Sequence, residues 1–60
     1  MKLRDAWGKK IRVIFKDGQV LEGTGEYYTS ELDNPEEEAS MSIGDVLFFE
    51  SEIERIELID

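Results

Sequence analysis

The chain has 60 residues, and its 15 Asp and Glu against seven Lys and Arg give a formal net charge of −8. A chain this short supports a single domain, because it buries only about 60% of its unfolded surface. It has no Cys and no His, which excludes a disulfide, a thiol nucleophile, a Ser-His-Asp triad and a zinc site. We expect no metal, no cofactor and no enzymatic activity, since the carboxylates also form no recognisable catalytic pair.

The charge is divided along the chain. Residues 1–16 hold six Lys and Arg against Asp5, a net of +5, whereas residues 17–60 hold Arg55 against fourteen acids, a net of −13. The simpler interpretation is a basic strand beside an acidic one, where opposite charges across a ladder each contribute roughly 0.2–1 kcal/mol. The alternative is a basic surface for nucleic acid.

The first part of the chain predicts a helical turn and a strand. Residues 1–8 contain one short helix, with Leu3 and Trp7 four residues apart on one face and Gly8 at its end. Residues 10–16 alternate apolar and polar side chains and predict a strand. Ile14 breaks the alternation and falls on the polar face, where the N-terminal turn or a neighbouring subunit would cover it.

Asp17-Gly18 is the strongest local signal, because such a pair between two strands favours a tight hairpin with positive φ at both positions. Residues 9–28 therefore form a hairpin, whose second strand runs over 19–28. Gly23 and Gly25 lie on one face of that strand and remove side chains where a strongly bent strand needs room.

The second half predicts a loop and three more strands. Residues 29–38 form an acidic loop without the ligand spacing of a calcium site. Residues 39–60 supply strands three to five, over 39–43, 46–49 and 53–59, with one helical turn at 50–52. The longest apolar run, 46–49, is far shorter than the ~20 residues that span a bilayer, and the N-terminus has no apolar signal-peptide region. We expect a cytoplasmic protein that does not bind a membrane.

These elements predict an all-β domain over residues 1–60, a small five-stranded, strongly bent antiparallel barrel with a short N-terminal helical turn. The predicted core comprises Leu3, Trp7, Ile11, Val13, Phe15, Leu21, Tyr27, Met41, Ile43, Leu47, Phe49, Ile53, Ile56 and Leu58. A core of this size yields only a few kcal/mol of stability, and oligomerisation is one remedy.

Residues 8–23 resemble the first motif of the Sm and Sm-like protein family. That motif has a Gly-Lys start, an alternating strand, an Asp-Gly or Asn-Gly pair and a Gly five residues later, here Gly8-Lys9, Asp17-Gly18 and Gly23. Residues 49–53 are loosely similar to the second motif. The resemblance implies a five-stranded Src-homology-3-like barrel and a ring in which the fourth strand of one subunit pairs with the fifth strand of the next.

The family binds single-stranded, often uridine-rich RNA, and this chain departs from its motifs. The Asp that follows the family's aromatic residue falls on Thr29, and the Arg-Gly pair falls on Glu50-Ser51. A Glu in place of Arg puts a negative charge beside a polyanion, which opposes binding because phosphate neutralisation dominates the affinity for single strands.

Our leading hypothesis is a non-enzymatic Sm-like assembly module that pairs with copies of itself. Its predicted oligomer interface comprises Val46, Phe48, Ile53, Arg55 and Ile59. The alternative is a single-stranded RNA-binding protein that uses a basic patch of Lys2, Arg4, Lys9, Lys10 and Arg12. Its candidate RNA contacts are Lys9, Lys10, Arg12, Tyr28, Asp33 and Asn34. We expect no DNA partner.

Overall fold

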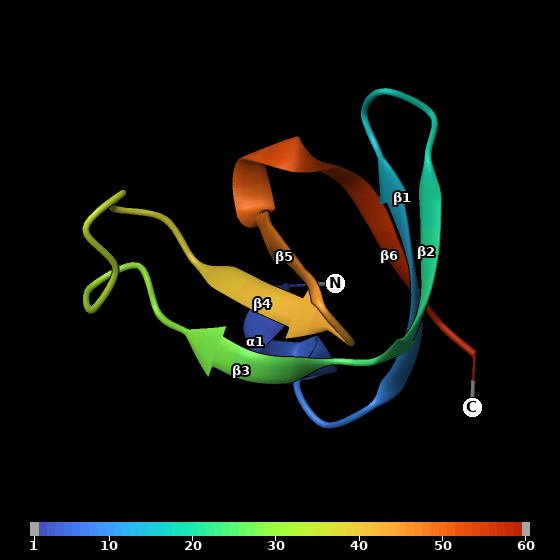
Figure 1. Cartoon of the computed structure of the whole chain (residues 1–60), viewed down its shortest axis with the longest axis horizontal. Coiled ribbons are helices and arrows are strands. Elements are labelled where there is room, and N and C mark those ends of the chain that lie inside the picture. Colours follow the sequence, from blue (N-terminus) through green and yellow to red (C-terminus); the bar gives the residue numbers. More distant parts are fainter. Residues whose placement is uncertain (1, 60) are drawn as a thin grey trace.

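The computed structural model describes residues 2–59; residues 1 and 60, the ends of the predicted domain, lie outside the described residues. The chain forms a small all-β domain with two three-stranded antiparallel sheets and one short helix (Figure 1). The elements are α1 (Leu3–Ala6), β1 (Lys10–Phe15), β2 (Val20–Thr24), β3 (Glu26–Thr29), β4 (Ser40–Ile43), β5 (Val46–Phe49), the 3-10 turn η1 (Glu50–Glu52) and β6 (Ile53–Leu58).

One sheet has the strand order β2-β1-β6 and the other has the order β3-β4-β5. All strand pairs within them are antiparallel. The six strands correct the predicted five, because the expected strand over 19–28 is divided at Gly25 into β2 and β3. Within residues 2–59, β5 and β6 do not pair, so the two sheets are not closed into a barrel.

The glycines at the bend between β2 and β3 have the predicted role of making room. A Cβ on Gly23 would lie 2.5 Å from Ile43 Cγ2, and a Cβ on Gly25 would lie 2.8 Å from Met41 Sδ. These are core side chains of β4. Because no real Cβ tolerates such distances, glycine is what lets the bent run pass directly over the second sheet.

The Asp17-Gly18 turn forms, but with a different geometry from the predicted one. Gly18 has φ 93°, whereas Asp17 is not among the positive-φ residues. The Gly18 N–H donates to the Phe15 carbonyl over 2.9 Å, and the Phe15 N–H donates to the Gln19 carbonyl over 2.9 Å. The connection is thus the three-residue type, in which a turn is followed by one left-handed glycine.

The core lies between the two sheets and beneath α1. Leu3, Ile11, Val13, Met41, Ile43 and Ile56 are buried as predicted, while Phe15, Leu21 and Ile53 pack against them partly buried. Ala6, Ala39 and Phe48 are buried residues that the predicted core lacks. The Phe15 and Phe48 rings meet edge to face with centroids 5.6 Å apart, which joins β1 to β5.

The side-chain parity of β5 is the reverse of the prediction. Leu47, predicted in the core, is 60% exposed, and Phe48, predicted at a subunit interface, is 1% exposed in the core of its own chain. Phe48 lies opposite Met41 in the β4–β5 register, so the two face the same side. Since side chains alternate along a strand, this pairing turns Leu47 outward.

Three other predicted core residues are exposed. Tyr27 is 78% exposed because a bulge places Tyr27 and Tyr28 together opposite one residue of β4, with Tyr27 at φ 54°. Tyr28 therefore takes the inward position. Trp7 is exposed although its ring packs 5.7 Å from that of Tyr28. Leu58 is half-exposed because it lies at the end of an outer strand.

Candidate functional site

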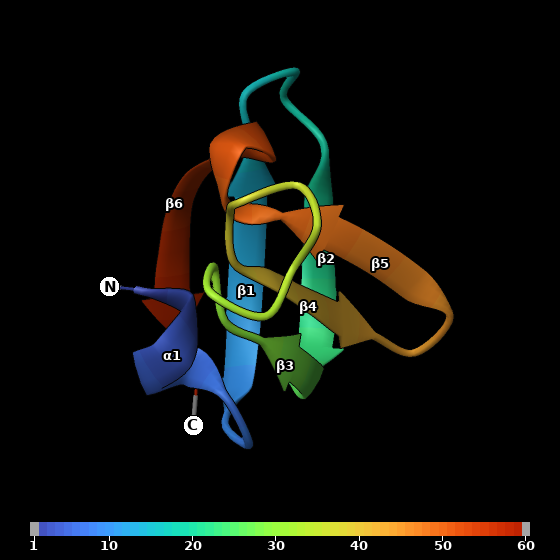
Figure 2. The ribbon, with the colours of Figure 1, turned by 90° about the vertical axis from the view of Figure 1, so that its left-hand side faces the viewer.

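Each sheet has two outer strands within residues 2–59, and β5 and β6 are the two that are not joined to the other sheet through Gly25. The run from β2 through Gly25 into β3 links the two sheets, which leaves β6 at the far end of one and β5 at the far end of the other (Figures 1 and 2). Within residues 2–59, β6 pairs only with β1, and β5 pairs only with β4. An unpaired edge presents free backbone N–H and C=O groups to any other strand.

The backbone hydrogen bonds of β5 show which of its groups point away from β4. In an antiparallel pair, residues alternate between those that bond across the pair and those that point away. The Glu50 N–H donates to the Ala39 carbonyl over 2.9 Å, so the same alternation makes Phe48 bond to β4. The backbone of Leu47 and that of Phe49 therefore point to the open edge.

The same argument applies to β6. The Ile59 N–H donates to the Lys10 carbonyl over 3.1 Å. Bonded residues recur at every second position, so Glu57 and Arg55 also face β1. The backbone groups of Ile56 and Leu58, which lie between them, therefore point away from β1. These two residues are the free positions of the second edge.

Apolar surface accompanies the β5 edge. Val46 and Leu47 are both exposed. They line a shallow groove of about 150 Å³, together with Phe15, Asp17, Gln19, Phe48 and Glu52. Its apolar floor and acidic margin suit a strand that brings an apolar side chain and a cation.

The predicted interface residues divide between the core and the surface. Val46 and Arg55 are exposed, and Arg55 Nε lies 3.2 Å from Glu57 Oε2. Ile53 and Ile59 are half-buried. Phe48 is buried within its own chain, so its side chain is not part of the open surface and Leu47 takes that place.

Glu52 is a functional candidate that the sequence analysis missed. Its Oε1 atom accepts a hydrogen bond of 2.9 Å from the Phe49 N–H, which is one of the donors at the β5 edge. A Glu three residues into a helical turn is a known partner of the N-cap N–H. The spacing from Phe49 to Glu52 could have revealed this contact.

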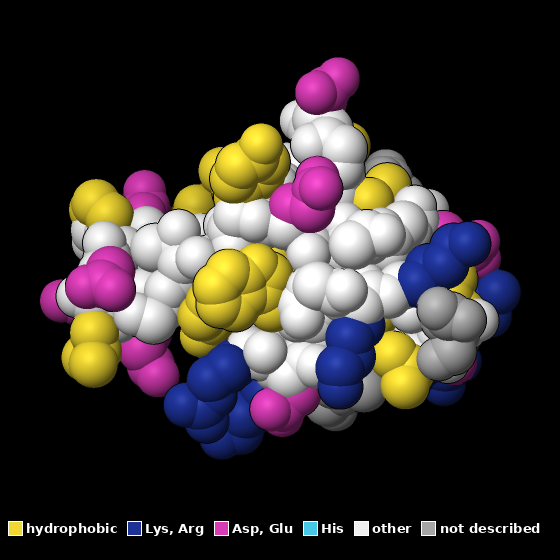
Figure 3. Space-filling model, turned by 90° about the horizontal axis from the view of Figure 1, so that it is seen from below, with side chains coloured by type: hydrophobic (Ala, Val, Ile, Leu, Met, Phe, Trp, Pro, Cys, Tyr) yellow, Lys and Arg dark blue, Asp and Glu magenta, His cyan; other side chains and the backbone are white. Residues whose placement is uncertain are grey.

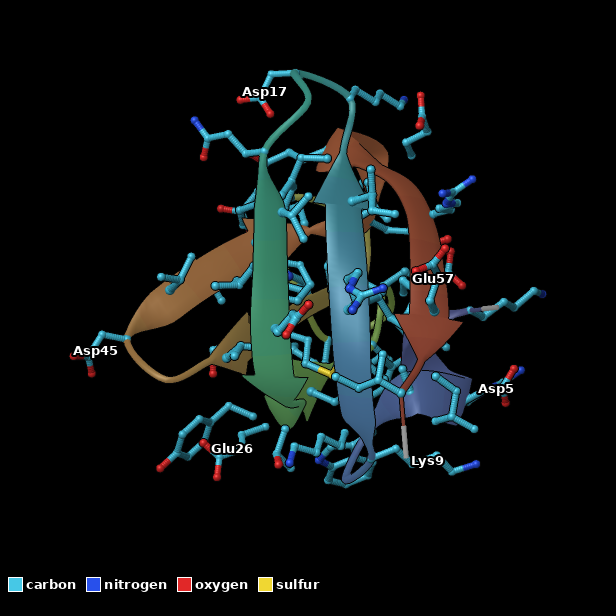
Figure 4. The ribbon with its side chains drawn as sticks, turned by 90° about the vertical axis from the view of Figure 1, so that its right-hand side faces the viewer. Asp5, Lys9, Asp17, Glu26, Asp45 and Glu57 are labelled. Carbon is cyan, nitrogen blue, oxygen red and sulfur yellow. The ribbon has the colours of Figure 1, made fainter. Side chains whose placement is uncertain are left out.

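Of the predicted RNA-binding residues, Lys9 and Lys10 line one hollow of about 330 Å³ with Gly8 and Leu58, and the other four lie elsewhere. Lys9 lies at one end of the β2-β1-β6 sheet, as Figure 4 shows. Arg12 lies on the outer face of that sheet, where its Nε is 2.6 Å from Glu22 Oε2 and its Nη1 is 3.2 Å from Glu57 Oε1. These hydrogen bonds, the one to Glu22 first, raise the pKa of Arg12 above its ordinary value.

Lys10, two residues before Arg12 on β1, is exposed. The other three candidates lie on or near the acidic loop. Asp33 Oδ2 accepts a hydrogen bond from Ser30 Oγ over 3.2 Å, and Asn34 Nδ2 donates to Ser40 Oγ over 3.0 Å. Both side chains thus have partners within the chain, which fix the loop between β3 and β4.

Tyr28 lines a hollow of about 230 Å³, whose other lining residues come from the N-terminal segment, the acidic loop and η1. Its walls carry both signs of charge, from Lys2, Arg4, Glu31 and Glu50. A neighbouring hollow of about 340 Å³ is lined by Glu31, Glu37, Glu38, Ala39, Glu50 and Ser51. Glu50 lines both hollows, so the surface between the loop and η1 is predominantly acidic.

One carboxylate of this surface is fixed by a backbone donor. The Ser51 N–H donates to Glu38 Oε1 over 2.9 Å. That hydrogen bond, followed by the one from the Ser51 side chain, lowers the pKa of Glu38 below its ordinary value of 4.5. Glu38 therefore stays ionised and ties the acidic loop to η1.

The face that carries the N-terminal segment has hydrophobic, basic and acidic side chains. Figure 3 shows hydrophobic side chains in the middle of this face, with Lys and Arg beside them and Asp and Glu around them. No helix within residues 2–59 has the length and apolar character needed to cross a membrane.

Comparison with known proteins returned no relative: no family model matches the chain, and no curated protein or solved structure is similar to it.

Proposed function

We propose that the chain is a non-enzymatic, Sm-like assembly module, which joins copies of itself into a ring by pairing the β5 edge of one copy with the β6 edge of the next. One observation carries this proposal: Val46 and Leu47 are exposed apolar residues on a strand whose outer edge is unpaired. Exposed apolar edges attract other strands, and natural proteins normally cover or charge them.

Three further features support the proposal. The edges of β5 and β6 are different surfaces of the chain, so a contact between them is head-to-tail, and such contacts close into rings when the rotation permits. The small core favours association as a source of stability. The chain also keeps the Gly8-Lys9, Asp17-Gly18 and Gly23 pattern of the Sm motif, with a helical turn before it and a bent strand after Gly18.

A substitution by proline tests the β5 edge directly. Leu47→Pro removes an N–H that points away from β4, so it spares the sheet and blocks an incoming strand. We expect sedimentation equilibrium at micromolar concentration to give an oligomer for the parent chain and a folded monomer for Leu47→Pro. A parent chain that stays monomeric across the concentration series contradicts the proposal.

Val20→Pro is the matched control. Val20 is 56% exposed against 60% for Leu47, and the hydrogen bond from Phe15 to Gln19 makes the N–H of Val20 point away from β1. The control therefore removes an equivalent outward donor from an outer strand that the proposed contact does not use. Equal loss of association in both variants would contradict assignment of the contact to β5.

The alternative function, binding of single-stranded RNA, has less support. Arg12 is held by Glu22 and Glu57, and Glu50 lines the hollow that contains Tyr28. Titration with labelled oligouridine at low salt decides between the two functions. Salt-dependent binding that Lys9→Gln weakens would favour RNA, whereas no binding at tens of micromolar protein removes the RNA alternative.

A further inference from the structure

We infer that Glu52 guards the β5 edge: its carboxylate holds the Phe49 N–H in the free chain and must yield that donor to a backbone carbonyl on β6 of a second copy when two chains join. This inference rests on the proposed self-assembly and adds to it a residue that sets its strength. The observation behind it is the 2.9 Å hydrogen bond from the Phe49 N–H to Glu52 Oε1.

The bond lies where a partner strand would bind. The Phe49 backbone points away from β4, because Glu50 and Phe48 supply the donors that face β4 on either side of it. The open edge of β5 thus has two outward N–H groups, those of Leu47 and Phe49, and Glu52 occupies the second. A strand that pairs along the whole edge has to displace this carboxylate.

Glu52 is well placed to act as a removable guard. Its side chain is exposed and projects from η1, and it lines the groove beside Val46 and Leu47. The backbone of η1 is held separately, since the Lys16 N–H donates to the Glu52 carbonyl over 3.0 Å. The carboxylate can therefore leave Phe49 while the backbone of the turn stays attached to β1.

The occupant is β6 of a second copy, because β6 is the other outer strand that is not joined to the second sheet, and it carries a cation. Arg55 is the one Lys or Arg in residues 17–60, and it lies exposed on β6. The groove beside β5 carries Asp17 and Glu52. Arg55 pairs with Glu57 in the free chain but stays exposed, so the displaced Glu52 carboxylate can share this cation, and the half-exposed Leu58 of the incoming strand matches the apolar floor.

The test compares three variants by sedimentation equilibrium. Glu52→Ala removes the acceptor, so we expect about three- to tenfold tighter self-association, the effect of one additional intermolecular hydrogen bond. Glu52→Gln keeps an oxygen that can accept the bond, and its affinity stays near that of the parent chain. Glu50→Ala removes one negative charge from the same turn without touching Phe49, and it controls for reduced repulsion.

Each outcome has a meaning. Equal self-association of Glu52→Ala and the parent chain overturns the inference. An equal gain in self-association for Glu52→Gln or Glu50→Ala also overturns it, since the loss of negative charge alone would then account for the gain. If the parent chain associates and Glu52→Ala does not differ, only this inference fails. If the parent chain is monomeric and Glu52→Ala assembles, the proposal that the parent chain assembles is contradicted. The inference that Glu52 blocks the β5 edge is then supported.

A measurement on the unmodified chain removes the dependence on variant folding. Amide hydrogen exchange at Leu47 and Phe49 is followed as the concentration rises through the association range. We expect both amides to become slower to exchange together, because both donate to the partner in the assembly. A Phe49 amide that keeps its dilute exchange rate while Leu47 becomes protected overturns the inference.

Discussion

The two sheets hold their outer strands in different ways. In the β2-β1-β6 sheet, Arg12 bridges Glu22 on one neighbouring strand and Glu57 on the other. In the β3-β4-β5 sheet, every residue of β4 is buried, whereas the outer strand β5 exposes Leu47. Ion pairs thus join the three strands of one sheet across its outer face, whereas the other sheet has a buried central strand and an outer strand with an exposed apolar side chain.

The largest expected effect comes from the core side of β5. Phe48→Ala removes a ring that packs against Phe15 and Met41, and we expect a loss of about 3–5 kcal/mol in the free energy of unfolding. Leu47→Ala, one residue away, is expected to cost less than about 0.5 kcal/mol in the monomer. Urea denaturation of both variants checks which of the two side chains faces the core. A larger loss of unfolding free energy for Leu47→Ala would contradict the assignment of Phe48 to the core.

The next effect concerns the bend that joins the two sheets. Gly23→Ala places a Cβ 2.5 Å from Ile43 Cγ2 at a residue with φ 152°, and we expect a loss of about 3 kcal/mol from overpacking and backbone strain. Gly18→Ala has a positive φ and open space around it, so it measures strain alone, about 1–2 kcal/mol. Equal losses of stability in the two variants, measured by thermal unfolding, would show that the close contact between residue 23 and Ile43 has no effect.

A smaller effect is expected from the charged face. Arg12→Met leaves Glu22 and Glu57 without their shared partner, and we expect a lower midpoint of thermal unfolding at low salt. The difference from the parent chain should largely vanish at about 1 M salt, where exposed charges are screened. Arg55→Met, which removes one contact to Glu57, serves as the control. A deficit that persists at high salt would indicate lost packing instead.

The smallest effect is a pH dependence of the acidic loop. The pKa of Glu38 is lowered in the folded chain, so its contribution to stability is complete above the ordinary value of 4.5. It is lost as the pH falls through the lower folded value. Below that range the hydrogen bond to Ser51 weakens, and we expect a lower protection factor for the Ser51 amide, that is, faster exchange relative to the intrinsic rate at the same pH. Glu38→Gln should lack this transition, and a parent chain without it would contradict the assignment.

Much of the fold could be predicted where the sequence has a period or a turn signal. Ile11 and Val13 alternate with charged residues, Gly18 follows Asp17, and the turn at 50–52 is short and polar; all three elements are present. The need for glycine at positions 23 and 25 was also correct. In each case local chemistry leaves few conformations for the backbone.

The wrong predictions concern residues at which the local sequence does not determine the direction of the side chain. Residues 46–49 are all apolar, so alternation cannot tell Leu47 from Phe48, and the turn at Gly44-Asp45 sets the register that decides it. The bulge at Tyr27 places a non-glycine residue at φ 54°. The sequence pattern contains no signal that predicts such a bulge. At the candidate site, the apolar strands were identified, whereas the contact of Glu52 with Phe49 was missed although it has the three-residue spacing of an N-cap pair.

The pairing of β1 with β6 joins residues that are more than forty positions apart, such as Arg12 and Glu57. During synthesis, β1 is therefore complete long before its second neighbour exists, and only the local hairpin with β2 can form early. Distant pairings slow folding because the loop has to close first. The domain is expected to fold only after β6 has left the ribosome, and during that delay the apolar side of β1 is open to chaperones.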